Sequence, residues 1–176
     1  MKKRIAWITV ILMMSLAIIA LAEDRKPLSP PAKAEATISG KSITIDYSSP
    51  RMRDRKIMGG LVPYDKVWRS GANAATTLKT EADLMISSLH VPAGEYTVFS
   101  IPGEGEWTLI INKQTGQWGT NYDESQDLGR VAMTVGSLDD ALEEFTIEIE
   151  PGEGNMGEIT LKWETTKASV PIMVHD

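Results

Sequence analysis

Apolar and polar residues alternate along two stretches of the chain, at 35–47 and at 145–164. The first stretch contains the turn Ser39-Gly40, and the second contains a loop with three glycines at 151–157. Successive side chains of a β-strand point to opposite faces, so this alternation predicts strands with one buried and one solvated face. Both stretches are therefore predicted β-hairpins.

Shorter strand candidates, separated by turns rich in Gly and Pro, lie between and after the hairpins. They are residues 76–79, 83–87, 96–101, 107–111, 130–135 and 169–174. No strand–helix–strand alternation, which is typical of parallel sheets, is visible. The sequence predicts an all-β fold, an antiparallel β-sandwich or jelly-roll-like fold of about nine strands. One short helix is expected at 137–144, where Ser137 is a candidate N-cap and Asp140 sits as in a capping box.

The first 22 residues have a different pattern. Three basic residues precede an apolar run at 5–19, and an Ala-Leu-Ala cleavage motif follows. This pattern predicts a signal peptide at 1–22, and its apolar run is short for a membrane span. Residues 23–34, which include three prolines, are expected to form an extended leader, and 35–176 a single domain. We expect an exported protein, periplasmic or extracellular, without a membrane span after cleavage.

The charge and composition of the chain limit its partners. The formal net charge is −6 at pH 7, whereas nucleic-acid binding requires a basic surface, so no nucleic-acid partner is expected. The chain has no cysteine, which excludes disulfides, a lipid-anchored cysteine and a cysteine nucleophile. The hydrophobic core must therefore stabilise the domain.

Residues 47–78 are the most distinctive part of the chain. They hold Arg51, Arg53, Arg55 and Arg69. The first three alternate, so in an extended loop they would share one side and could bind a carboxylate, sulfate or phosphate through their planar guanidinium groups. The alternative is that they pair with acidic side chains of the same chain or face water.

Three runs in this part of the chain are similar to one protein family. They are Arg55-Lys56-Ile57-Met58-Gly59-Gly60-Leu61-Val62-Pro63-Tyr64, Val67-Trp68-Arg69-Ser70-Gly71-Ala72-Asn73 and Ala75-Thr76-Thr77. Further matches follow at 92–96, 99–103, 106–108, 112–113, 118–119, 122–123 and 163–164. Together they resemble the exported bacterial family called domain of unknown function 2911. The resemblance implies a compact exported domain with no agreed activity. The chain departs from it at Ser49, where arginine is expected, and at Asp54, where glycine is expected.

The run 68–73 allows two interpretations. In the first, Tyr64, Trp68, Arg69 and Asn73 line a ligand pocket, in which Arg69 and Arg55 hold the charge of the ligand. In the second, the run is a structural corner where Trp68 fills the core and Arg69 satisfies buried carbonyls.

A polar stretch at 118–127 also contains two aromatic residues. Trp118 and Tyr122, next to Asp123, Glu124 and Asp127, could form a platform for stacking a sugar. The carboxylates could instead bind calcium, but the spacing of an EF-hand is missing. A solvated loop held by two aromatic residues is the third possibility. We expect no metal site and no cofactor.

Conventional catalytic motifs are missing from the sequence. His90 and His175 are the only histidines, and there is no HExxH motif and no P-loop. Paired carboxylates leave no local mark, so a hydrolase using acids at 104–106 and 122–127 stays possible. Enzymatic activity is left open and is not favoured.

Three functions remain as hypotheses. The leading one is a binding module for a small anionic or carbohydrate-like ligand; an envelope interaction or scaffold domain, with an unidentified protein partner, and a glycan-acting hydrolase are the alternatives. The candidate ligand-binding residues are Arg55, Tyr64, Trp68, Arg69, Asn73, Trp118 and Tyr122.

Overall fold

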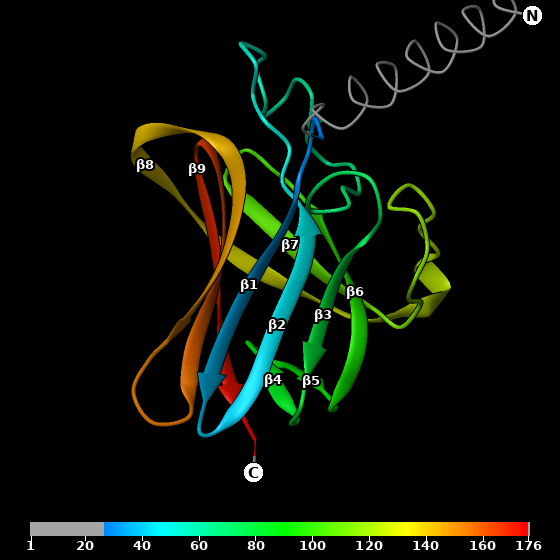
Figure 1. The fold of residues 1–176 in the computed structure, drawn as a ribbon, viewed down its shortest axis with the longest axis vertical. Helices are drawn as coiled ribbons and strands as arrows, with labels where there is room; N and C mark the ends of the chain where they lie inside the picture. The colour runs from blue at the N-terminus through cyan, green and yellow to red at the C-terminus, as the bar shows by residue number, and fades with distance from the viewer. Residues whose placement is uncertain (1–26, 176) are drawn as a thin grey trace, which may run out of the picture.

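The computed structural model describes residues 27–175, which fold into nine β-strands and one short 3-10 turn, η1 (Glu124–Gln126) (Figure 1). The strands are β1 (Pro31–Ile38), β2 (Lys41–Ser48), β3 (Thr76–Thr80), β4 (Leu84–Ile86), β5 (Leu89–Val91), β6 (Gly94–Ile101), β7 (Glu106–Asn112), β8 (Asp127–Pro151) and β9 (Met156–Val174). The predicted all-β fold is confirmed. The predicted signal peptide and the first residues of the predicted leader lie outside the described residues.

All nine strands belong to one antiparallel sheet, in the order β1-β2-β3-β6-β7-β8-β9-β4-β5. The first part of β8 pairs with β7, and its last part forms a long hairpin with β9. Because β8 and β9 are long and bent, the sheet folds over and β1 lies beside the β8–β9 hairpin (Figure 1). The result is a sandwich-like body with its core between the folded halves of one sheet.

The alternation of residue types explains the two hairpins. In β2, Ile43, Ile45 and Tyr47 are buried, while the residues between them are more exposed. In the second hairpin, Ile147 of β8 lies opposite Leu161 of β9, and both are buried. Burial of each such side chain contributes roughly 1.5–3 kcal/mol, so this register fixes which face of each strand meets the core.

The helix predicted at 137–144 is wrong, because these residues belong to β8. Here the register between β8 and β9 shifts twice, so that 138–141 lie opposite Thr165 and 143–145 lie opposite Trp163. The extra residues bend out of the sheet and find hydrogen-bond partners in a distant segment. The Phe145 amide donates to the Pro50 carbonyl, and the Met52 amide donates to the Glu143 carbonyl, both at 2.9 Å. These long-range bonds override the local helical pattern.

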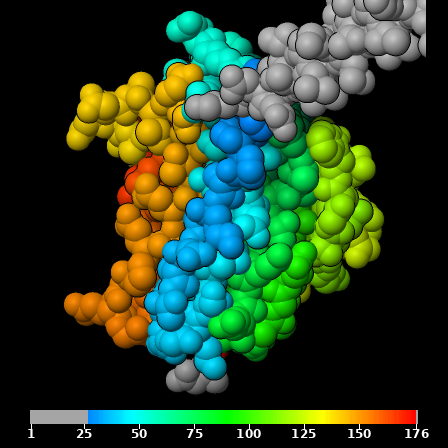
Figure 2. Space-filling view, viewed as in Figure 1, coloured from blue at the N-terminus to red at the C-terminus, as the bar shows by residue number. Residues whose placement is uncertain are grey.

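The chain between β2 and β3, residues 49–75, forms the loops at one end of the body. Figure 2 shows its 51–62 part projecting beside the protruding residues of β8. Among residues 27–175, no helix has the length and hydropathy needed to cross a membrane.

Candidate functional site

The run 68–73 is fixed between strands β6 and β2. Trp68 pairs with Ser100 of β6 through two backbone hydrogen bonds of 2.7 and 2.8 Å. The buried Ser70 hydroxyl donates to the Ser100 hydroxyl at 3.0 Å. On the other side, Gly71 passes so close to β2 that an added Cβ would lie 3.0 Å from the Ser48 carbonyl oxygen. The main chain of this run is therefore held rigidly by the sheet.

Trp68 belongs to an aromatic cluster. Its ring stacks on Trp163 at a centroid distance of 5.9 Å and meets Phe145 and Trp107 edge-on at 4.9 and 6.3 Å. The other three rings are almost fully buried, whereas Trp68 is only half-buried. Edge-on and offset pairs of this kind are favourable beyond the area that they bury. Trp68 therefore packs on the core and also faces a cavity.

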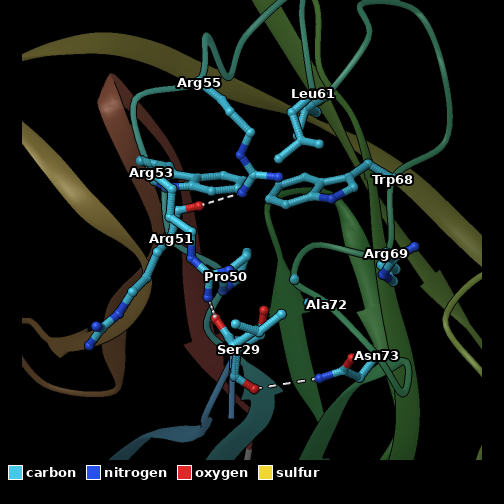
Figure 3. Close-up of a pocket in the computed structure, with 14 residues that line it drawn as sticks. Ser29, Pro50, Arg51, Arg53, Arg55, Leu61, Trp68, Arg69, Ala72 and Asn73 are labelled. Atoms are coloured by element: carbon cyan, nitrogen blue, oxygen red, sulfur yellow. Dashed lines mark hydrogen bonds between the residues drawn. The ribbon is translucent and has the colours of Figure 1, made fainter. Parts of the chain in front are cut away.

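A cavity of about 360 Å³ lies between this cluster and the 51–55 loop (Figure 3). Its lining is half apolar and includes four arginines. The lining residues are Leu28, Ser29, Pro50, Arg51, Arg53, Arg55, Leu61, Val62, Trp68, Arg69, Gly71, Ala72, Asn73 and Trp163. Within the part of the chain that the structure describes, no aspartate or glutamate lines it. The cavity is thus cationic although the protein as a whole is acidic.

The arginines of the 51–55 loop differ in their partners. Arg51 forms an ion pair with Glu144, and Figure 3 shows its side chain turned away from the other two. Arg53 donates from Nη2 to the Leu28 carbonyl at 2.5 Å. Arg55 donates from Nε to the Met52 carbonyl at 2.9 Å and from Nη2 to the Arg51 carbonyl at 2.7 Å. The predicted pairing with acids of the chain therefore applies to the Arg51 side chain, while the guanidinium groups of Arg53 and Arg55 bond only carbonyl oxygens among residues 27–175.

The loop that carries these arginines is a tight turn and not the extended segment that alternation suggested. Arg53 and Asp54 have left-handed φ angles of 49° and 59°. Glycine is the residue that adopts this conformation at least cost, which explains the glycine expected at position 54 from the family resemblance. The turn brings Arg55 back over Met52, so that Arg53 and Arg55 both reach the cavity.

Arg69 lines the cavity from its opposite side. Its neighbour Trp68 points into the cluster, and adjacent residues of an extended segment point to opposite sides. The Arg69 side chain accordingly packs on Gly119, where an added Cβ would lie 2.2 Å from Arg69 Cδ. Its Nε is buried and bonds no acceptor among residues 27–175. Figure 3 shows Arg69 directed away from Arg53 and Arg55.

Asn73 and Tyr64 differ in their relation to the cavity. The side-chain amide of Asn73 donates from Nδ2 to the Ser29 carbonyl at 3.4 Å, and this contact closes one end of the cavity (Figure 3). Tyr64 lies outside the lining and packs on Gly59, where an added Cβ would be 2.7 Å from its ring. The structure therefore brings Asn73, but not Tyr64, together with the arginines.

Trp118 and Tyr122 also lie away from the cavity. Trp118 is 55% exposed, and its backbone pairs with Ala74. The Tyr122 hydroxyl donates to the Asp127 carboxylate at 2.6 Å and accepts from Arg130 at 2.8 Å. Burial, together with the hydrogen bond to Asp127 and its charge, raises the pKa of Tyr122 to about 12. Tyr122 therefore holds the 118–127 loop to the start of β8 through these two hydrogen bonds.

The other titratable groups considered from the sequence lie apart from the cavity. The His90 ring and the Asp83 carboxylate are 3.0 Å apart near β4 and β5. The Ala93 amide, with a smaller contribution from His90, lowers the pKa of Asp83. No group of three or more potential metal-ligating side chains occurs within residues 27–175.

Sequence reasoning missed several residues of the cavity. Leu61, Ala72 and Trp163 line it, and only the third fell in a predicted strand. Glu164, the neighbour of Trp163, has a left-handed φ of 53°, and its carboxylate accepts from the amides of Ile57 and Met58 at 3.5 and 3.3 Å. Leu61, Ala72 and the Trp-Glu pair at 163–164 all lie in runs of the family resemblance, which was the only sequence signal that pointed toward them.

Comparison with known proteins identifies a family for this chain but no individual relative. No curated protein and no solved structure matches the chain. A family model described as "Protein of unknown function (DUF2911)" matches residues 29–172, which include β1 to β8, all of β9 except its last two residues, and the whole cavity lining except Leu28. The chain therefore belongs to the DUF2911 family.

Proposed function

We propose that this protein binds a small anion in the arginine cavity. The observation that carries the proposal is the state of Arg53 and Arg55. Both line the cavity, and neither guanidinium group has a carboxylate partner among residues 27–175. A chain of net charge −6 has acids in excess, so two cations gathered without them are suited to an outside anion.

The geometry of Arg55 supports the same conclusion. Its Nε and one terminal nitrogen donate to carbonyls of its own loop, which holds the guanidinium in place. A cation that is already ordered loses little conformational freedom when an anion binds. The planar guanidinium also offers further N–H groups, which suit the oxygen atoms of a carboxylate or a phosphate.

The cavity gives less support to the alternative functions. A glycan-acting hydrolase needs two carboxylates facing one cleft. Among residues 27–175, none lines this cavity. A neutral sugar would leave the two guanidinium charges uncompensated. The anionic form of the ligand-binding hypothesis is therefore the one that the cavity supports best.

Titration with inorganic phosphate, sulfate and acetate tests the proposal, with tryptophan fluorescence as the signal because Trp68 lines the cavity. Arg55→Met keeps much of the side-chain volume and removes the charge. It should weaken anion binding about tenfold or more, since a charged hydrogen bond is worth roughly 1.5–3 kcal/mol. Lys56→Met is the matched control, because Lys56 is exposed in the same loop and does not line the cavity. Equal effects of the two substitutions, or no binding of any anion, would refute the proposal.

We further propose export, for which the support is the pattern of basic and apolar residues at 1–22. Mass spectrometry of the protein recovered from its host should find Glu23 as the first residue. Recovery of the intact amino terminus would contradict it.

A further inference from the structure

The cavity combines a charged wall with an apolar wall, and we infer that its ligand is an organic anion with an apolar body. This inference rests on the proposed function and narrows it to a ligand class. Arg53 and Arg55 form the charged wall. The apolar wall consists of Leu28, Pro50, Leu61, Val62, Trp68, Ala72 and Trp163.

Two side chains of the apolar wall are exposed to solvent. Leu61 is 46% exposed and Leu28 is 71% exposed, although both border the cavity. Figure 3 shows Leu61 and Arg55 reaching toward the Trp68 ring from the same side. An apolar group next to the bound charge would cover Leu61 and the open part of Trp68, and burial of that area favours binding. An inorganic ion would leave both in water.

The size and rigidity of the cavity suit one small organic molecule. Its volume of about 360 Å³ is near the lower end of the range of roughly 300–1,000 Å³ for small-molecule sites. The Trp68 ring is stacked on Trp163 and its backbone is bonded to Ser100, so the flat apolar surface is formed before a ligand arrives. A preformed apolar surface beside fixed cations matches a ligand with a ring or short hydrocarbon body and one oxyanion group.

A set of five probes separates the contributions of charge and apolar body. Phenylacetate and phenyl phosphate carry both features, acetate and inorganic phosphate carry only the charge, and phenylacetamide carries only the ring. Calorimetric titration of the protein should show each aromatic anion binding about tenfold or more tighter than its small counterpart, as burial of part of one ring provides. Phenylacetamide should bind far more weakly than phenylacetate.

A pair of substitutions locates the apolar contact. Leu61→Asn should remove most of the advantage of phenylacetate over acetate, whereas Val67→Asn should retain it. Val67→Asn is the control, because Val67 is similarly exposed, at 39%, in the same loop region but does not line the cavity. Neither side chain is part of the buried core, so both variants should keep the fold.

The outcomes distinguish the inference from the proposed function. If phenylacetate and acetate bind with equal affinity while Arg55→Met still weakens anion binding, the inference of an apolar body is refuted and the proposed anion binding stands. Equal affinity for phenylacetate and phenylacetamide would overturn both, because charge would play no part. Failure of every anion to bind would likewise overturn both.

Discussion

The Arg69 side chain lines the cavity and also packs on Gly119 of the neighbouring loop, and Gly119→Ala tests this packing. In the structure an added Cβ at Gly119 would lie 2.2 Å from Arg69 Cδ, 3.0 Å from Arg69 Cβ and 2.8 Å from the Asn73 carbonyl oxygen. Real Cβ atoms essentially never come within 3.0 Å of a neighbouring heavy atom. Alanine therefore requires the Arg69 side chain to leave its place, and the Asn73 backbone to shift as well.

The expected loss of stability follows from these two contacts. Overpacking of a filled site costs about 1–3 kcal/mol, so Gly119→Ala should lower the free energy of unfolding by that amount. Arg69→Ala removes the Cδ contact but leaves the Asn73 contact. In the double variant the loss should therefore be smaller than the sum of the two single losses by about 0.5 kcal/mol or more.

Urea unfolding followed by fluorescence of the five tryptophans measures all of these free energies. Gly105→Ala is the control, since an added Cβ there meets nothing within 4 Å and its φ is not in the left-handed region. It should be nearly neutral. Strictly additive effects of Gly119→Ala and Arg69→Ala would mean that the Arg69 side chain does not pack on Gly119.

Two further predictions concern groups that hold the loops in place. The pKa of Tyr122 is raised from 10.0 to about 12, so its contribution to stability is complete below about pH 10 and is lost as the pH rises toward the folded-state value. The pKa values of Tyr47 and Tyr96 are also raised by burial, so an ultraviolet titration of tyrosine ionisation should show late ionisation whose amplitude Tyr122→Phe reduces, whereas completion of all ionisation near pH 10 would contradict the burial of the Tyr122 hydroxyl. Glu164→Ala removes the acceptor for the Ile57 and Met58 amides and should lower the free energy of unfolding by about 1–3 kcal/mol. Thr165→Ala, at an exposed neighbour, should change little, and equal stability of the two variants would show that the carboxylate does not hold the 57–58 turn.

The sequence predicted those parts of the fold in which local pattern and tertiary structure agree. The alternation in β1, β2 and the β8–β9 hairpin identified the strands because each has one face on the core. The helix predicted at 137–144 does not form because its pattern is local, while the hydrogen-bond partners of these residues include Met52 and Arg53 in a distant segment. The separate strands predicted at 130–135 and 145–150 are one strand, since the protruding residues interrupt the register and not the strand.

The sequence predicted the part of the candidate site that lies in the single segment 55–73. Arg55, Trp68, Arg69 and Asn73 were grouped by sequence and all line one cavity. Tyr64 could not be separated from them, because only the tertiary structure shows that it packs on Gly59. Trp163 could not be added, because it reaches the cavity from a strand that lies about ninety residues further along the chain.

The bonds between the arginine loop and β8 also bear on the order of folding. Arg51 pairs with Glu144, and the Arg53 amide donates to Glu143, across sequence separations of 93 and 90 residues. Contacts between such distant residues form slowly, because a long loop must close before any bond compensates for the lost entropy. A growing or partly folded chain can build the β1–β2 hairpin early, but it cannot seat Arg53 and Arg55 until β8 is in place. Ligand binding at the cavity would therefore indicate that the whole domain, including β8, has folded. Chains truncated before β8 should have no binding site.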